Sequence, residues 1–244
     1  MKQGYFSILE NTQLNDLVYK MKLSGDVSKI TKPGQFVNIK LDGLFLRRPI
    51  SVCDKEDNTL TIIYKVVGQG TEKLSQMTSG SLDILTGLGN GYDESLSGDR
   101  PLLIGGGVGV PPLYLLAKRL ISQGKKVSVI LGFNTKDEIF YYNEFKNLGC
   151  EVLTTTVDGS FGIKGFVTDA INNVDYSYVY TCGPEPMLKA VYKTINTSGQ
   201  FSFEERMGCG FGACMGCSCK TLYKNKRICK DGPVLFKEEI IWEN

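Results

Sequence analysis

Residues 102–112 read Leu-Leu-Ile-Gly-Gly-Gly-Val-Gly-Val-Pro-Pro, an apolar run followed by a glycine-rich turn and two prolines. The apolar run is typical of a buried strand, and proline is favourable in the first turn of a helix. A strand, a glycine-rich turn and a helix in this order let backbone N–H groups approach a pyrophosphate. We therefore predict nucleotide binding at Gly105, Gly106, Gly107 and Gly109. The spacing departs from G-x-G-x-x-G, and a tight connection without a ligand is the alternative.

Strands and helices alternate downstream of this turn. The hydrophobic pattern predicts helices over 111–123, 138–148 and 185–195, and strands over 126–131, 151–157 and 178–181. This order is typical of a doubly wound parallel sheet. Cys182, Gly183 and Pro184 follow the last strand, at the carboxyl edge where open α/β sheets bind ligands. They are a second candidate segment, with Cys182 beside a nicotinamide; a plain helix start is the alternative.

The chain before residue 97 instead shows short β-type runs separated by turns. Strands are predicted over 5–9, 17–23, 36–41, 50–53, 60–67 and 82–85. Short strands at this spacing indicate a small antiparallel barrel. The polar segment 95–99 is the predicted boundary between the barrel and the α/β region.

Three segments of this barrel carry groups suited to a flat cofactor that bears phosphate. In the run Arg48-Pro49-Ile50-Ser51, the planar guanidinium can meet a phosphate and the serine offers a hydroxyl. The run Ile63-Tyr64-Lys65 offers an aromatic ring, and Gly70-Thr71 offers an N–H and a hydroxyl at a turn. Solvated surface side chains are the alternative for each.

Five of the eight cysteines lie between residues 209 and 229. Cys209, Cys214 and Cys217 have the spacing C-x4-C-x2-C, with Cys229 further on, which is the plant-type [2Fe–2S] arrangement. Small residues between them let the loop curl so that three thiolates converge, and the exposed N–H groups can donate to cluster sulfurs. Structural zinc and disulfides are the alternatives. Zinc sites usually pair two CxxC-like knuckles, and disulfides are typical of small secreted chains.

The fourth cluster ligand is Cys229 or Cys219. Cys219 lies two residues beyond Cys217, so both would point to one side of an extended chain. The segment 218–228 predicts a strand, a turn and a returning strand, which would carry Cys229 back toward the loop. We therefore predict Cys229 as the ligand and Cys219 as a free thiol. The segment 201–244 is too small for a core of its own, so a metal is expected to organise it.

Composition narrows the function further. The chain has 244 residues, of which 42% are apolar and 22% charged, the balance of a globular protein. Its net charge of +2 gives no basic field for nucleic acid. The absence of histidine excludes Ser-His-Asp and Cys-His hydrolases. No signal peptide is visible, and the longest uncharged run, 101–117, is broken by glycine and proline, so we expect a cytoplasmic protein without a membrane span.

Taken in order, the motifs at 48–51, 70–71, 105–112 and 182–184 resemble those of the ferredoxin reductase superfamily. With the cysteine loop, preceded by Glu204-Glu205-Arg206-Met207, the chain resembles one branch: the electron-transfer subunits of class-B, NAD-dependent dihydroorotate dehydrogenases. The resemblance covers essentially the whole chain. It implies an antiparallel FAD-binding β-barrel over 1–97, a parallel-sheet NAD-binding α/β domain over 98–200 and a small [2Fe-2S] domain over 201–244.

The resemblance also implies which residues hold the cofactors. FAD would be held by Arg48, Pro49, Ile50, Ser51, Ile63, Tyr64, Lys65, Gly70 and Thr71. NAD would face Gly105, Gly106, Gly107, Gly109, Cys182, Gly183 and Pro184, and the cluster would be bound by Cys209, Cys214, Cys217 and Cys229. The segment 134–138 has two acids and no arginine pair for a 2′-phosphate, which favours NAD over NADP.

The parts that the resemblance implies would form an electron relay, and we expect no site for an organic substrate among them. Nicotinamide moves two electrons as hydride, a [2Fe–2S] cluster moves one at a time, and a flavin does both. We therefore expect a second polypeptide to hold the substrate. In the resembled enzyme that subunit carries FMN and oxidises dihydroorotate in pyrimidine synthesis, in an assembly of two catalytic and two electron-transfer subunits.

The partner is expected to dock on the apolar residues beside the ligands, Met207, Phe211 and Met215, for which a local core is the alternative. Two other functions stay open. One is an electron-transfer subunit for a hydrogenase or a glutamate-synthase-like flavoprotein. The other is a zinc-binding regulatory module without redox turnover.

Overall fold

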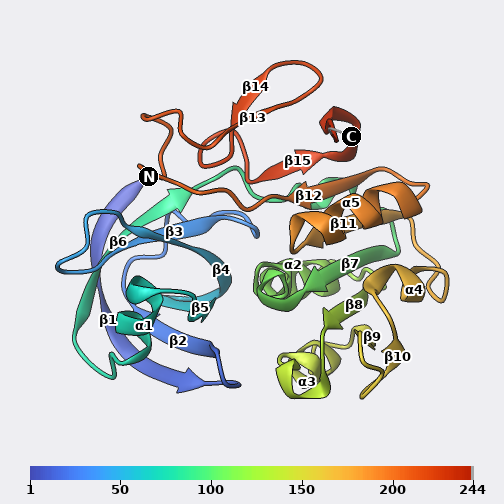
Figure 1. The fold of residues 1–244 in the computed structure, drawn as a ribbon, viewed down its shortest axis with the longest axis horizontal. Helices are drawn as coiled ribbons and strands as arrows, with labels where there is room; N and C mark the ends of the chain where they lie inside the picture. Colours follow the sequence, from blue (N-terminus) through green and yellow to red (C-terminus); the bar gives the residue numbers. More distant parts are fainter. Residues whose placement is uncertain (243–244) are drawn as a thin grey trace.

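An antiparallel barrel forms the N-terminal part of the computed structural model, which describes residues 1–242 (Figure 1). Its strands are β1 (Lys2–Gln13), β2 (Val18–Ser24), β3 (Phe36–Lys40), β4 (Arg48–Glu56), β5 (Thr59–Lys65) and β6 (Ser81–Leu88). They are ordered β1-β2-β5-β4-β3-β6, and β6 pairs with β1 to close the barrel. Val37, Ile39 and Ile62 are fully buried in its interior. The predicted barrel is confirmed. A short helix that the pattern did not predict, α1 (Gln69–Ser75), follows β5.

A seven-stranded sheet forms the second part of the fold, in the order β10-β9-β8-β7-β11-β12-β15. The strands are β7 (Pro101–Gly106), β8 (Ser128–Phe133), β9 (Glu151–Thr156), β10 (Ile163–Lys164), β11 (Tyr178–Cys182), β12 (Gly199–Ser202) and β15 (Val234–Phe236). All pairs are parallel except β12 with β15. The predicted parallel sheet is therefore confirmed, with one antiparallel strand added at its edge.

Helices cover both faces of this sheet. They are α2 (Pro111–Ser122), α3 (Tyr142–Asn147), α4 (Val167–Ile171) and α5 (Glu185–Thr194). The side chain of Leu103 on β7 packs in the core that contains α2 and α3. Its neighbours Leu102 and Ile104 point the other way, into the core that contains α4 and α5. This alternation explains why β7 reads as a continuous apolar run.

The prediction of a helix over 138–148 is wrong for the first turn. Lys136–Glu138 form a 3-10 turn, and α3 begins only at Tyr142. Tyr141 precedes it with a left-handed φ of 63°, which a continuous helix does not allow. Its side chain is buried with Phe140 and Phe145, so tertiary packing decides where the helix starts.

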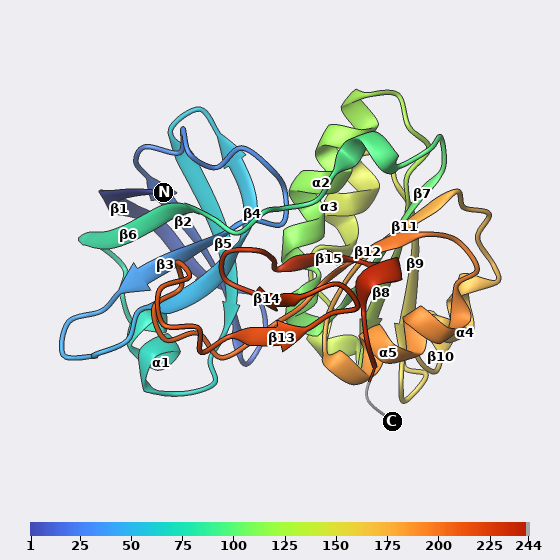
Figure 2. The ribbon, with the colours of Figure 1, turned by 90° about the horizontal axis from the view of Figure 1, so that it is seen from above.

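The C-terminal segment lies across the junction of the barrel and the sheet (Figure 2). It contains the hairpin β13 (Ser218–Lys220) and β14 (Asn225–Arg227), as predicted, and then β15. Ile228, Leu235 and Ile240 are buried in the core that holds α4 and α5, together with barrel residues Phe36 and Leu88. A metal is expected to organise this segment because it is too small for a core of its own; the structure shows that packing on both domains also holds it. The predicted boundary at 200/201 falls inside β12.

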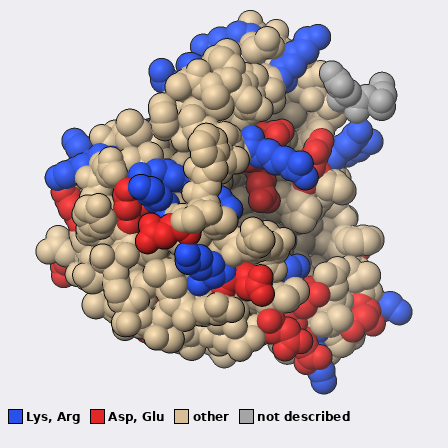
Figure 3. Space-filling view, turned by 60° about the vertical axis from the view of Figure 1, so that its left-hand side comes forward, with Lys and Arg blue, Asp and Glu red and all other residues tan. Residues whose placement is uncertain are grey.

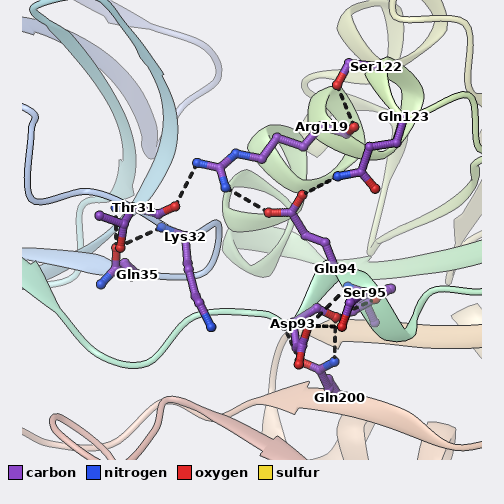
Figure 4. A network of polar contacts seen from close by, with 11 residues as sticks. Thr31, Lys32, Gln35, Asp93, Glu94, Ser95, Arg119, Ser122, Gln123 and Gln200 are labelled. Atoms are coloured by element: carbon purple, nitrogen blue, oxygen red, sulfur yellow. Dashed lines mark hydrogen bonds and ion pairs between the residues drawn. The ribbon is translucent and has the colours of Figure 1, made fainter.

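The linker after β6 contacts helix α2 and strand β12, and α2 in turn contacts the barrel. Around Glu94–Leu96, a 3-10 turn, Arg119 of α2 donates to the Glu94 carboxylate at 2.8 Å and to the Thr31 carbonyl of the barrel at 3.0 Å (Figure 4). Gln200 of β12 exchanges two hydrogen bonds with the Asp93 backbone. These contacts fix the orientation of the barrel relative to the sheet. In residues 1–242, no helix combines the length and the hydropathy that a membrane crossing requires.

Candidate functional site

The glycine-rich turn lies at the point where the strand order of the sheet reverses. From β7 the chain continues through β8 and β9 on one side, and then returns to β11 and β12 on the other. The carboxyl ends of β7 and β11 are adjacent, with Gly105 opposite Cys182. Open α/β sheets bind ligands at such a reversal. The two segments predicted to face the nicotinamide nucleotide therefore meet at the expected place.

Small residues are required where these two segments touch. A Cβ added to Gly109 would lie 2.3 Å from the Cys182 carbonyl oxygen, and one added to Gly106 would lie 2.5 Å from the Met187 sulfur. Gly107 has a φ of +50°, and a Cβ there would meet nothing within 4 Å. The turn is thus packed tightly against β11 on one side and open on the other, just before α2 begins. An open side with backbone N–H groups at the start of a long helix fits a nucleotide pyrophosphate.

The Cys182 thiol is held neutral by its surroundings. Burial raises its pKa to about 12, and the charge of Glu204 adds to this shift. A neutral thiol at the end of β11 presents a small, polarisable surface rather than a nucleophilic thiolate.

The segment after β8 contains no arginine. Asn134 donates from its side-chain amide to both carboxylate oxygens of Glu138, at 3.0 and 2.9 Å. The carboxylate is thereby held at the carboxyl edge of the sheet, next to β7. A fixed acid at this place suits a ribose 2′-hydroxyl better than a 2′-phosphate.

On the barrel, strand β4 begins with four half-buried residues, Arg48, Pro49, Ile50 and Ser51. A Cβ added to Gly70 would lie 2.1 Å from Nε of Arg48, so the start of α1 closes over the guanidinium. Arg48 also donates to the Leu46 carbonyl. The Thr71 hydroxyl accepts from the Val67 N–H at 2.9 Å and shapes the loop rather than pointing outward. The structure thus brings Arg48 and Gly70 together at one end of β4.

The third barrel segment is placed differently. The Tyr64 side chain is buried inside the barrel, and its hydroxyl donates to Asn11 at 3.0 Å. Ile63 points the other way, into the core shared with α2, and Lys65 is exposed. In this arrangement, the ring of Tyr64 does not reach the surface on which a flat cofactor would lie. Main-chain groups are what this segment can offer.

Backbone N–H groups surround Cys209, the first cysteine of the cluster loop (residues 209–217). The N–H groups of Ala213 and Cys214 donate to the Cys209 sulfur at 3.2 and 3.5 Å. Although burial opposes it, these donors lower the pKa of Cys209 to about 6. The thiolate is the form that binds iron, so the loop is prepared for a metal. The turns of the loop need positive φ at Gly210 and Gly212, which supply it without strain.

The four predicted ligands stand as two pairs. Cys214 neighbours Cys209, with a hydrogen bond between their thiols. The Cys229 N–H donates to the Cys217 sulfur at 3.4 Å, and burial raises the pKa of the Cys229 thiol to about 12. The charge of Cys209 also raises the pKa of Cys229.

Two pairs of thiols fit a two-iron cluster, in which four thiolates are shared between the irons. In residues 1–242, no three Cys, Asp or Glu side chains are gathered closely enough to hold a metal ion, so the expected convergence of three thiolates is not seen there. Cys219 lies on β13, where its environment is set by burial, by Glu205 and by the neighbouring Cys217, and burial raises its pKa. Cys229 lies beside Cys217, and Cys219 lies on β13. The choice of Cys229 as the fourth ligand stays a prediction.

Two residues that the sequence analysis missed anchor this loop. Asn38 of β3 donates from its amide to the Cys209 carbonyl at 3.2 Å. Arg227 donates to the Gly212 carbonyl at 2.8 Å and is held by Asp231 at 3.0 Å. A polar residue in the middle of the apolar run Phe36–Lys40 was a signal that could have identified Asn38. For Arg227 the sequence carries no comparable signal.

Comparisons with known proteins agree with this geometry. The sequence model of the oxidoreductase NAD-binding domain matches residues 103–193, and that of the iron-sulfur cluster binding domain of dihydroorotate dehydrogenase B matches residues 204–241. A Fusobacterium nucleatum protein is 47% identical over 98% of this chain and 99% of its own, and a Bacillus pumilus protein is 45% identical over 98% of each. Both are named dihydroorotate dehydrogenase B (NAD(+)), electron transfer subunit.

Solved structures show the same fold. A chain of an NADH-dependent reduced ferredoxin-NADP oxidoreductase, studied for flavin-based electron bifurcation, superposes with a TM-score of 0.88 at 31% identity, over 97% of this chain and 90% of that one. A ferredoxin NADP+ reductase from Neisseria gonorrhoeae, solved with FAD and NADP, superposes with a TM-score of 0.70 at 18% identity, over 80% of this chain and 90% of that one.

Proposed function

Because the chain belongs to the family of electron-transfer subunits of NAD-dependent dihydroorotate dehydrogenase B, we propose that it passes electrons between NAD and the FMN of a catalytic subunit. The route runs through FAD on the barrel and a [2Fe-2S] cluster in the C-terminal segment. The catalytic subunit oxidises dihydroorotate for pyrimidine synthesis, and the assembly holds two of each subunit.

One observation carries this proposal: the strand register brings β4, the candidate flavin strand, and the cluster loop to the same side of the barrel. On β3, Phe36 and Asn38 lie opposite Ser51 and Pro49 of β4. Side chains directly opposite each other on antiparallel strands share one face of the sheet. Phe36 packs in the core with Cys217 and Cys229, and Asn38 holds the carbonyl of Cys209. A flavin along β4 and a cluster in the loop would thus be neighbours.

The residues of the chain bind and orient, since the cofactors supply two-electron and one-electron chemistry when bound. The open side of Gly107 and the start of α2 would receive the NAD pyrophosphate. The guanidinium of Arg48 would meet the phosphate groups of FAD, and its contact with Gly70 limits its movement. The N–H groups of Ala213 and Cys214 would stabilise negative charge on the Cys209 sulfur.

The surface around the cluster loop fits a protein partner. Phe211 is 43% exposed and Met215 is 55% exposed, beside the half-buried Met207. The segment 218–230 contains five cations and no acid: Lys220, Lys224, Lys226, Arg227 and Lys230. Lys226 is paired with Glu239 and Arg227 with Asp231, so the basic rim consists of Lys220, Lys224 and Lys230. Figure 3 shows Lys and Arg along the top of the molecule, where Figure 1 places this hairpin. An apolar centre with a basic rim fits a partner surface with an acidic rim.

Anaerobic purification together with the catalytic subunit tests the proposal. We expect flavin and cluster absorption bands, iron and acid-labile sulfide in equal amounts, and recovery of an FMN-containing dihydroorotate dehydrogenase in the same complex. A colourless protein that holds zinc would defeat the relay. Recovery with a different flavoprotein would defeat only the assignment of the partner.

A second candidate function is favoured by the structural match at 31% identity to a chain of an electron-bifurcating oxidoreductase. In that case the same relay would serve a different flavoprotein complex. The identity of the co-purified partner separates the two.

A further inference from the structure

The outer face of β3 is covered by the C-terminal segment. Val37 and Ile39 point into the barrel, so the alternation of the strand turns Phe36 and Asn38 outward. Asn38 is nevertheless only 1% exposed. An amide buried to this degree on the outside of a barrel has been covered by another part of the chain, here the cluster loop.

The contact between Asn38 and this loop is unusually close. Nδ2 donates to the Cys209 carbonyl at 3.2 Å. A Cβ added to the next residue, Gly210, would lie 2.3 Å from Nδ2, and Gly210 has a φ of +77°. The loop therefore approaches Asn38 to a distance that only glycine permits in this conformation.

Asn38 is equally tied to the candidate flavin strand. It lies directly opposite Pro49 on β4, and its backbone carbonyl accepts from Arg47 at 3.3 Å. Its side-chain Oδ1 is buried and has no hydrogen-bond partner within residues 1–242. Buried polar atoms are nearly always paired in folded proteins, so an orphaned acceptor on a residue paired with this strand indicates a donor that a ligand supplies.

We propose that Asn38 is a positioning residue that couples the two cofactor sites. Its amide N–H holds the cluster loop through the Cys209 carbonyl, while Oδ1 accepts a hydrogen bond from a donor of the flavin bound along β4. The inference rests on the proposed function and adds to it the residue that sets the two cofactors relative to each other.

The test replaces Asn38 by leucine, which has nearly the same shape and neither polar atom. Thr86→Val is the matched control, because Thr86 is also a 1% exposed polar residue of the barrel, on β6, and donates to Lys2 away from the cluster loop. Each purified holoprotein is compared for FAD dissociation, for visible circular dichroism of the cluster, and for the rate at which NADH reduces the cluster in anaerobic stopped flow.

We expect Asn38→Leu to weaken FAD binding about tenfold, to alter the cluster dichroism, and to slow cluster reduction by roughly ten- to a hundredfold, because small displacements of redox partners carry large rate costs. Thr86→Val should change none of the three. A leucine variant with unchanged FAD binding, dichroism and rate overturns the proposal.

A double-mutant cycle keeps the test informative if the leucine variant folds poorly. Gly210→Ala is made in the natural chain and in an Asn38→Ala chain, and cluster dichroism and reduction rate are compared. The backbone strain of alanine at position 210 is the same in both chains and cancels in the comparison. If contact with Asn38 positions the loop, Gly210→Ala costs less in the Asn38→Ala chain, whereas additive effects contradict the proposal. The natural protein must first show flavin and cluster, and its failure to do so would count against the proposed function instead.

Discussion

At the scale of single residues, the structure distinguishes the two candidates for the fourth cluster ligand, Cys219 and Cys229. Cys229 donates its N–H to the Cys217 sulfur, whereas Cys219 is separated from the two pairs by its place on β13. The difference arises because the hairpin returns the chain to the loop only at residue 228, whose N–H is bonded to the Cys217 carbonyl at 3.0 Å.

Serine substitution at these two positions checks the ligand assignment. Cys229→Ser should lose most iron and sulfide, because removing one of four thiolates leaves the cluster incompletely held. Cys219→Ser, its matched control, should retain both. Iron and sulfide analysis of anaerobically purified proteins measures this, and the opposite pattern would reassign the fourth ligand.

The Cys182 thiol provides a prediction about pH. Its pKa is raised from 9.0 to about 12 by burial, so it stays protonated in the folded protein where an unfolded chain would begin to ionise. At pH 8, alkylation of Cys182 should be roughly a hundredfold or more slower in the folded protein than in the denatured chain, because only the thiolate reacts. Mass spectrometry of iodoacetamide-treated protein measures the rate, and equal rates would contradict the raised pKa.

The same shift has a consequence for stability. A thiol whose pKa is higher in the folded state favours folding below the unfolded value of 9.0. This contribution is lost as the pH rises from about 9 toward 12. Alkaline titration of the unfolding free energy should therefore show a decline that starts near pH 9 and is smaller in Cys182→Ala.

At the scale of elements, the junction between β7, β11 and α2 depends on close packing of backbone. Gly109 lies at the turn into α2 and would place a Cβ 2.3 Å from the Cys182 carbonyl. Neither backbone can yield without moving a strand or a helix, so the turn and the end of β11 act as one rigid wall of the candidate nucleotide site.

Gly109→Ala tests this wall. The added methyl should displace the start of α2, destabilise the protein by about 1–3 kcal/mol and raise the dissociation constant of NADH. Gly4→Ala is the matched control, because the nearest atom to its added Cβ is a Phe6 ring carbon at 3.7 Å. Thermal unfolding and NADH titration measure both effects; a Gly109→Ala protein that behaves as the control would show that the wall can adapt.

At the scale of the whole molecule, Asn90 in the linker connects the C-terminal segment (residues 201–242) to the rest of the fold. Its amide donates to the Val234 carbonyl at 2.7 Å, and its carbonyl oxygen accepts from the Val234 N–H at 3.1 Å. Its own backbone N–H donates to Gly232 at 2.7 Å. The linker that joins the barrel to the sheet therefore also fixes the entry of β15 into the sheet.

Asn90→Ala should make the C-terminal segment less tightly held at β15 without unfolding the two larger domains. We expect faster hydrogen exchange at residues 232–236, because two of the bonds that hold this segment are lost. The control is Asn173→Ala, which changes an exposed residue after α4 and should leave hydrogen exchange at residues 232–236 unchanged. Unchanged exchange in Asn90→Ala would show that packing alone holds β15.

Much of this organisation was open to prediction because it depends on local pattern. Alternating apolar residues marked the barrel strands, and the run at 102–104 with its glycine turn marked β7 and α2. Short elements such as α1, α4 and β12 were missed, since a few residues carry too little periodicity. The start of α3 was misplaced because burial of Tyr141, a tertiary effect, overrides helix propensity.

The order of residues determined the kinds of site that this protein can build: a glycine turn after a strand, an arginine on a barrel strand, and a cysteine loop with the spacing of a two-iron cluster. Only the tertiary structure decided how these sites are combined. Register places Asn38 opposite Pro49, and β15 joins a sheet whose other strands lie earlier in the chain. Local spacing encodes what one segment can bind, whereas the separation of two segments depends on packing between residues far apart in sequence, which no local pattern records.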